Sequence, residues 1–185
     1  NVRPKKKVRS AIAVKTFTEW DDVAPGSLEV DFVAHCGGNL SGSFIHSLVA
    51  TDVASGWTEC MPILIREQSL VVETLKLLQQ RFPFPVRGMN TDNDSTFIND
   101  SVIDFCDSQS ITFTRSRPYR KNDQAWIEQK NGAVIRRFVG YARYSGPVAG
   151  QTLANLYQNL RLYVNYFQPS FKLLSKHREG SKVKK

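Results

Sequence analysis

The order of strand-like and helical segments is the feature that most constrains the fold of this chain. Three strand-like runs come first, separated only by short turn-forming stretches, and short connections favour antiparallel neighbours. After these three runs, helical and strand-like segments alternate along the chain. The strand-like segments are 27–35, 44–53, 57–65, 86–91 and 111–116, and the helical ones are 67–82, 96–108, 123–144 and 148–167. This order predicts an α/β fold with one five-stranded mixed sheet, its first three strands antiparallel, flanked by helices on both faces.

Length and composition narrow the class of protein. A chain of 185 residues can bury one sizeable core, and 41% hydrophobic with 23% charged residues is ordinary for a globular domain. No apolar run approaches the roughly 20 residues of a membrane span, so we expect no membrane association. Three separated cysteines favour a reduced, cytoplasmic protein over a disulfide scaffold, and three scattered histidines make a zinc site unexpected.

The charge distribution points towards a polyanionic partner. The formal net charge is +8, and residues 1–15 and 172–185 each contain six basic residues. The remainder, 16–171, has 13 basic and 16 acidic residues, but eight of those basic residues fall within 115–143. Such a basic segment on a mildly acidic body favours nucleic acid as partner, although a solvated helix face is the ordinary alternative. We expect a basic arm at 1–26, a core domain at 27–170 and a basic tail at 171–185.

Two aspartates stand at unusual places in the predicted sheet. Asp31 lies in the middle of the first strand, where aspartate is rare. Asp92 directly follows the strand 86–91. Since Asp94 or Ser95 could cap the next helix, Asp92 is not needed for capping.

A glutamate, Glu128, lies near the start of the helix 123–144, for which Asp123 is a plausible N-cap. Helical spacing places Gln124 and Asn131 on the same polar face as Glu128. That face borders an apolar stripe, and the basic residues of the helix fall on its other, exposed faces. The stripe consists of Ile127, Val134, Phe138 and Tyr141, and the basic residues are Lys130, Arg136 and Arg137.

Three converging carboxylates would suit two hard divalent cations that cleave or transfer a phosphodiester. Without metal they would repel each other, and basic neighbours would partly offset this repulsion while holding a phosphate backbone. Residue types alone leave this open, because the chain has 17 acidic residues from which many triples could be drawn.

The spacing and its surroundings resemble a known family. Thirty-five residues separate Asp92 from Glu128, which resembles the D, D-35-E pattern of retroviral integrases and insertion-sequence transposases, with Asp31 as the first aspartate. Four further matches fall at set positions: Thr91-Asp92-Asn93, Pro118-Tyr119, Gln124 with Asn131, and the ending Asn165-Tyr-Phe-Gln168-Pro169. The resemblance covers about residues 26–172 and implies a ribonuclease-H-like fold.

This resemblance also implies an activity. Such bacterial enzymes use two Mg²⁺ or Mn²⁺ ions to cleave transposon ends and to transfer the 3′-hydroxyl ends into target DNA, and they act as homo-oligomers on DNA in the cytoplasm. Asp31, Asp92 and Glu128 would be the catalytic residues and metal ligands. The residues implied as DNA contacts are Arg117, Tyr119, Arg120, Lys121, Gln124, Lys130, Asn131, Arg136 and Arg137. An inactive DNA-binding relative and a ribonuclease-H-type nuclease that cuts without joining are the alternatives.

One residue departs from the family pattern. Asp94 stands where the family usually has glycine, which tolerates a positive φ better than aspartate does. Asp94 would also add a fourth carboxylate near the metals. We therefore expect Asp94 to decide whether the site is active.

Overall fold

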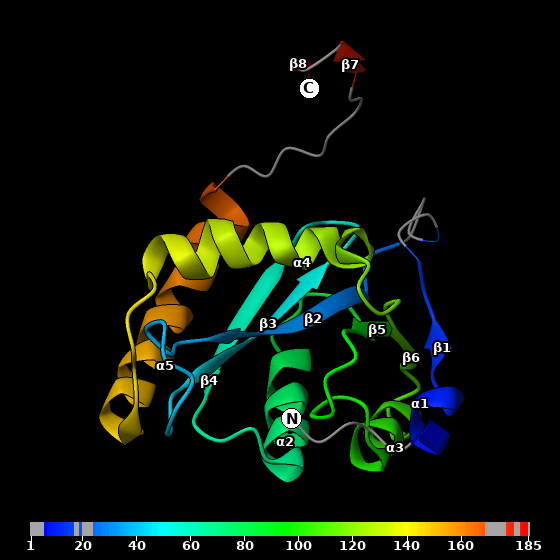
Figure 1. Ribbon diagram of the computed structural model, residues 1–185, viewed down its shortest axis with the longest axis horizontal. Coiled ribbons are helices and arrows are strands. Elements are labelled where there is room, and N and C mark those ends of the chain that lie inside the picture. The colour runs from blue at the N-terminus through cyan, green and yellow to red at the C-terminus, as the bar shows by residue number, and fades with distance from the viewer. Residues whose placement is uncertain (1–5, 17–18, 20–23, 169–176, 180–181, 185) are drawn as a thin grey trace.

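The computed structural model describes residues 6–16, 19, 24–168, 177–179 and 182–184 (Figure 1). Within these residues no helix is both long enough and apolar enough to cross a lipid bilayer. A short helix, α1 (Lys6–Ala11), precedes the sheet, and a small hairpin of β7 (His177–Glu179) and β8 (Lys182–Lys184) stands apart from it.

The main sheet of the described chain has six strands in the order β1-β6-β5-β2-β3-β4. Its strands are β1 (Ala13–Val14), β2 (Ser27–Ala34), β3 (His46–Asp52), β4 (Thr58–Ile63), β5 (Gly88–Thr91) and β6 (Thr112–Arg115). The predicted antiparallel meander is confirmed, because β2 pairs with β3 and β3 with β4 in antiparallel register. The other pairs, β2 with β5, β5 with β6 and β1 with β6, are parallel.

The strand count of five was wrong by one. The additional strand is β1, which lies in the segment expected to be a basic arm and pairs with Thr114 and Arg115 at the edge of the sheet. Two residues carry too little pattern to be recognised as a strand from sequence, since the alternation that identifies a strand needs at least about four residues.

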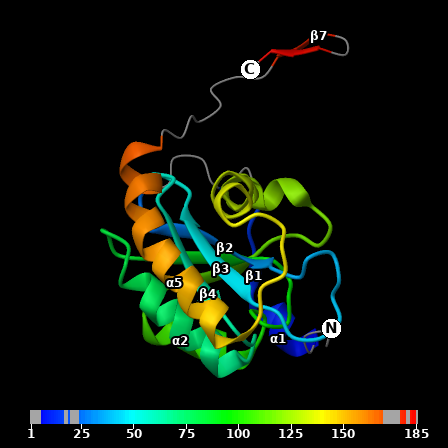
Figure 2. The ribbon, with the colours of Figure 1, turned by 90° about the vertical axis from the view of Figure 1, so that its left-hand side faces the viewer.

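Helices cover both faces of the sheet, as predicted (Figures 1 and 2). On one face α2 (Gln68–Gln79) and α3 (Asp100–Ser108) bury Val71, Leu75 and Phe105 against strand residues such as Val30. On the other face lie the helices whose buried residues form the second core. They are α4 (Ala125–Lys130) and α5 (Gly146–Leu162), extended by the π-helical segments η3 (Asn131–Arg136) and η4 (Tyr163–Phe167).

The helix predicted for 123–144 is shorter than its pattern suggested. It begins as the 3₁₀ turn η2 (Lys121–Gln124), passes through α4 and η3, and ends before Gly140, which has a φ of 79°. The wide turns of η3 change the helical phase, so Ile135 enters the core while Phe138 is 37% exposed. Tyr141 lies beyond the end of the helix and is 74% exposed. The predicted stripe is therefore right for Ile127 and Val134 and wrong for Phe138 and Tyr141.

A buried ion pair ties α5 to β4. Glu59 is fully buried, and Arg161 donates from Nη2 to its Oε1 at 2.7 Å and from Nε to its Oε2 at 2.8 Å. Trp57 Nε1 donates to the same carboxylate at 2.8 Å. These contacts fix the helix that covers the second core.

Replacing Arg161 by alanine should lower the free energy of unfolding by about 3 kcal/mol, because Glu59 would stay buried without its cation. Urea denaturation measures this loss. The matched control is Lys76→Ala, whose partner Glu73 is 63% exposed, and which should cost no more than about 0.5 kcal/mol. Equal losses in the two variants would contradict the importance assigned to the buried pair.

Candidate functional site

Two of the three predicted carboxylates meet because their strands are parallel neighbours. In the pairing of β2 with β5, Val30 lies opposite Thr91. Asp31 follows Val30 on β2, and Asp92 follows Thr91 at the end of β5, so the two aspartates are neighbours. Both line a cavity of about 330 Å³. Its remaining walls come from Phe32, Ala34, Leu40, Phe44, His46, Arg66 and Asp94.

The carboxylate of Asp31 is held from two sides. Its Oδ1 accepts from the backbone N–H of Phe32 at 2.7 Å, and its Oδ2 accepts from Asn131 Nδ2 at 2.8 Å. Burial and then the charge of Asp92 raise the pKa of Asp31 to about 6, with a smaller contribution from Glu128. Burial likewise raises the pKa of Asp92. The pair therefore forms a region of concentrated, poorly solvated negative charge.

Glu128 approaches this pair from α4. Its side chain is exposed, yet its charge is close enough to contribute to the raised pKa of Asp31. Among the described residues, no three histidine, cysteine, aspartate or glutamate side chains are gathered tightly enough to hold a metal ion as they stand. The structure thus brings Asp31 and Asp92 together and places Glu128 within electrostatic range of them.

A fourth acid, Glu29, positions α4, and sequence reasoning did not single it out. Glu29 is fully buried, and its Oε2 accepts from the backbone N–H of Ile127 at 2.8 Å. Burial raises the pKa of Glu29 to about 8. The sequence does carry one signal that could have identified Glu29. It is two residues from Asp31, so both side chains point to the same face of β2.

The helix start differs from the prediction that Asp123 caps it. The Asp123 carboxylate is fully buried and accepts from Arg117 Nε and Nη2, each at 2.8 Å. The cap position of α4 is Gln124, which makes no side-chain capping bond. Glu29 of β2 also provides an acceptor for the first turn of α4, through the backbone N–H of Ile127.

Asp94 is not the strained, free carboxylate that the sequence suggested. The non-glycine residues with positive φ in the described chain are Ser110 and Tyr119, so the backbone of Asp94 is unstrained. Arg66 Nη1 lies 2.9 Å from its Oδ2, and its Oδ1 accepts from the N–H and hydroxyl of Thr96 at 2.8 and 2.7 Å. Although burial opposes it, these contacts lower the pKa of Asp94.

The predicted DNA contacts occupy different surroundings. Tyr119 is fully exposed, and Arg117, Arg120 and Arg137 are exposed as well. Gln124, Asn131 and Arg136 are half-buried, and the Arg136 guanidinium donates to the carbonyl oxygens of Ala34 and Gly140 at 3.2 and 3.3 Å. The side chain of Lys121 lies outside the described part of the structure.

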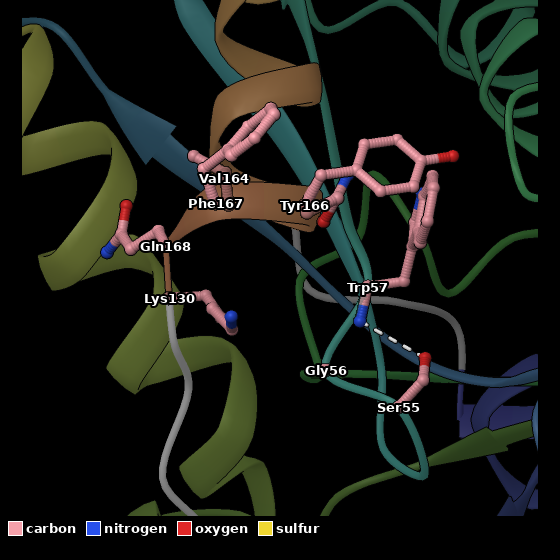
Figure 3. A pocket seen from close by; sticks show the side chains of 9 residues that line it. Ser55, Gly56, Trp57, Lys130, Val164, Tyr166, Phe167 and Gln168 are labelled. Atoms are coloured by element: carbon pink, nitrogen blue, oxygen red, sulfur yellow. Dashed lines mark hydrogen bonds between the residues drawn. The ribbon is translucent and has the colours of Figure 1, made fainter.

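Lys130 was predicted on an exposed helix face, and this was wrong. Only 8% of Lys130 is exposed, and its side chain points into a pocket separate from the cavity of Asp31 and Asp92 (Figure 3). Glu128 and Lys130 are two residues apart, about 200° around the helix, so they face opposite sides of α4.

Replacing Asp94 by glycine should lower the free energy of unfolding by about 1 kcal/mol, because Thr96 loses its acceptor and Arg66 loses its partner. Thermal or urea unfolding measures the effect. Asp94→Asn keeps an oxygen acceptor for Thr96 and should lose less. A glycine variant as stable as the parent protein would show that these contacts contribute nothing.

The raised pKa of Asp31 has a consequence for stability. An unfolded aspartate has a pKa of about 3.9, so between pH 4 and 6 the folded chain binds more protons at this residue and loses stability as the pH rises. Asp31→Asn removes that loss. Its stability relative to the parent protein should increase from pH 4 to pH 7 by about 2 kcal/mol, measured without divalent cations. A difference that does not vary with pH would contradict the shift.

Comparisons with solved structures agree with this architecture. The catalytic core domain of BIV integrase aligns with a TM-score of 0.59 at 19% identity, over 80% of this chain and 88% of that chain. A simian T-cell lymphotropic virus intasome in complex with PP2A regulatory subunit B56 gamma aligns with a TM-score of 0.59 at 15% identity, over 90% of this chain and 53% of that chain. The fold is therefore the ribonuclease-H-like fold of integrase catalytic cores.

Sequence comparisons identify the family of this chain. The uncharacterized protein y4rM of Sinorhizobium fredii (strain NBRC 101917 / NGR234) is 54% identical over 178 residues, which cover 96% of this chain and 51% of that protein. The chain thus spans about half the length of this curated relative. The profile of the integrase core domain family matches residues 22–121, a range that includes Asp31 and Asp92 and ends before Glu128. The chain belongs to the integrase core domain family.

Proposed function

We propose that this domain is the catalytic core of a DNA transposase or integrase. It would cleave the ends of a mobile DNA element and transfer their 3′-hydroxyl groups into target DNA. The observation that carries the proposal is the meeting of Asp31 and Asp92 on adjacent parallel strands, with Glu128 on a helix tied to the same strand. The catalytic core would span about 27–170 and act as a homo-oligomer on DNA in the bacterial cytoplasm.

The site fits a pair of Mg²⁺ or Mn²⁺ ions by the chemistry of its donors. Carboxylate oxygens are the ligands that these hard cations prefer, and buried, mutually repelling carboxylates are stabilised by a cation. The carbonyl oxygen Oδ1 of Asn131, next to Asp31, is buried without a hydrogen-bond partner in the described structure. Asp31, Asp92 and Glu128 would hold the ions, which would activate water or a 3′-hydroxyl as nucleophile and stabilise the leaving oxygen.

The surrounding residues of the chain would orient the acids and the DNA. Asn131 fixes the rotation of the Asp31 carboxylate through its hydrogen bond, and Glu29 fixes the start of the helix that carries Glu128. Arg117 and Arg120, exposed in the segment before α4, would contact phosphates, and the exposed ring of Tyr119 would pack against the strand.

The decisive test compares Glu128→Gln and Asp92→Asn with the parent protein. Each should reduce strand transfer and end cleavage in Mg²⁺ or Mn²⁺ by at least about 100-fold, because a neutral amide binds a cation poorly, while folding and DNA binding persist. A branched oligonucleotide that mimics the joined product serves as substrate, since its resolution is the reverse of strand transfer.

The control is Glu73→Gln on α2, whose side chain is exposed and lies away from the site. Full strand transfer by Glu128→Gln would contradict the assignment of the acids. Cleavage without joining in the parent protein would favour the ribonuclease-H-type nuclease instead. DNA binding without either reaction would favour an inactive relative.

A further inference from the structure

A second pocket, on the other side of α4, has a volume of about 490 Å³. Figure 3 shows its three walls: Lys130 on α4, the turn of Ser55, Gly56 and Trp57 between β3 and β4, and the segment of η4 around Tyr166 and Phe167. Val164, Asn165 and Gln168 complete the lining. This volume lies within the range of about 300–1,000 Å³ that is typical of small-ligand sites.

Two of these walls are held to each other, so the pocket exists before any ligand arrives. The side chain of Asn165 accepts from the backbone N–H of Thr58 at 2.8 Å and donates to its carbonyl oxygen at 2.9 Å. The rings of Trp57 and Tyr166 meet edge to face, with centroids 5.3 Å apart. A preformed site loses less conformational freedom on binding than one that must be ordered by its ligand.

The side chain of Lys130 is largely enclosed and has no anionic partner in the described structure. The residue is 92% buried, and none of the described residues that line the pocket is acidic. Two buried carboxylates of the described chain lie against guanidinium groups: Glu59 against Arg161, and Asp123 against Arg117. Because the ammonium group reaches the pocket and no acidic side chain of the described lining neutralises it, the pocket offers a positive charge to a ligand that brings one negative charge.

We propose that this pocket binds one unpaired nucleotide of the DNA strand, with its phosphate at Lys130 and its base against the aromatic rings of η4 and the β3–β4 turn. The proposal rests on the proposed function, because it takes DNA as the ligand. A phosphodiester supplies the single negative charge that Lys130 lacks. Tyr166 and Phe167 are 65% and 74% exposed, so their ring surfaces are open to a base.

The position of the pocket supports this ligand over an acidic peptide. Glu128 and Lys130 project from opposite sides of α4, a helix about 10 Å wide, so one DNA strand that passes around α4 can contact both the carboxylates and the pocket. The base must be unpaired, because stacking on a protein ring needs a free base face. The pocket therefore favours an unpaired, single-stranded segment of DNA over a fully paired duplex.

The test measures the affinity of the full chain for two labelled probes by fluorescence anisotropy: a blunt duplex, and the same duplex with a six-nucleotide unpaired tail. The parent protein should bind the tailed probe at least about fivefold more tightly. Lys130→Met should remove this preference and reduce the slope of log affinity against log salt by about 0.7. Phe167→Ala should weaken tail binding without changing the salt slope.

Lys76→Met, on the opposite face of the sheet, is the control and should retain the preference. The Lys130→Met variant should melt no lower than the parent protein, since an apolar side chain of similar length replaces a buried charge, and the exposed Phe167 can be replaced without risk to the fold. A parent protein without tail preference, or a Lys130→Met variant that keeps it, would overturn the proposal. So would an aromatic acidic peptide that binds in a Lys130-dependent manner where the tail does not.

The tail-binding test of the pocket can succeed or fail independently of the strand-transfer test of the proposed function. Glu128→Gln leaves the pocket intact and should keep the tail preference. If the parent protein binds the tail through Lys130 but resolves no branched DNA, the pocket assignment stands and the catalytic one fails.

Discussion

The hydrogen bond from the Ile127 backbone to the buried carboxylate of Glu29 is the contact on which the rest of the site depends. Strand β2 carries both Glu29 and Asp31, so a single strand holds the start of α4 and provides the first acid of the site. The helix in turn presents Glu128 and sends Asn131 back to Asp31. Strand and helix are therefore joined at two points, and displacement of either would separate the acids.

Much of this arrangement was predictable because it follows from periodicity and spacing. The antiparallel meander has turn residues at its connections, and the parallel pairing of β2 with β5 places Asp31 and Asp92 in neighbouring positions. Helical spacing predicted that Asn131 shares the face of Glu128, and the structure adds its hydrogen bond to Asp31. Such features depend on local sequence, which determines the direction of side chains along a strand or a regular helix.

The remaining features depended on contacts between distant segments. The sequence around Lys130 follows a regular helical pattern, and only the packing of α4 against η4 and the β3–β4 turn buries that side chain. The π-helical turns of η3 change the phase of the residues that follow within the same helix, and no single residue marks these turns. Asp94 was misread because its partner, Arg66, lies 28 residues away along the chain.

The loop residue Tyr119 has a consequence of a different kind. It holds a left-handed backbone with a φ of 60° although its ring is fully exposed. A bulky residue in this conformation costs on the order of 1 kcal/mol, and an exposed ring contributes little packing energy to offset it. Any ligand that packs against this ring therefore binds one loop conformation in preference to others. Ligand binding at Tyr119 and the conformational equilibrium of the loop are then thermodynamically linked. A substitution elsewhere in the loop that only shifts this equilibrium would therefore change affinity although the ring contact is kept.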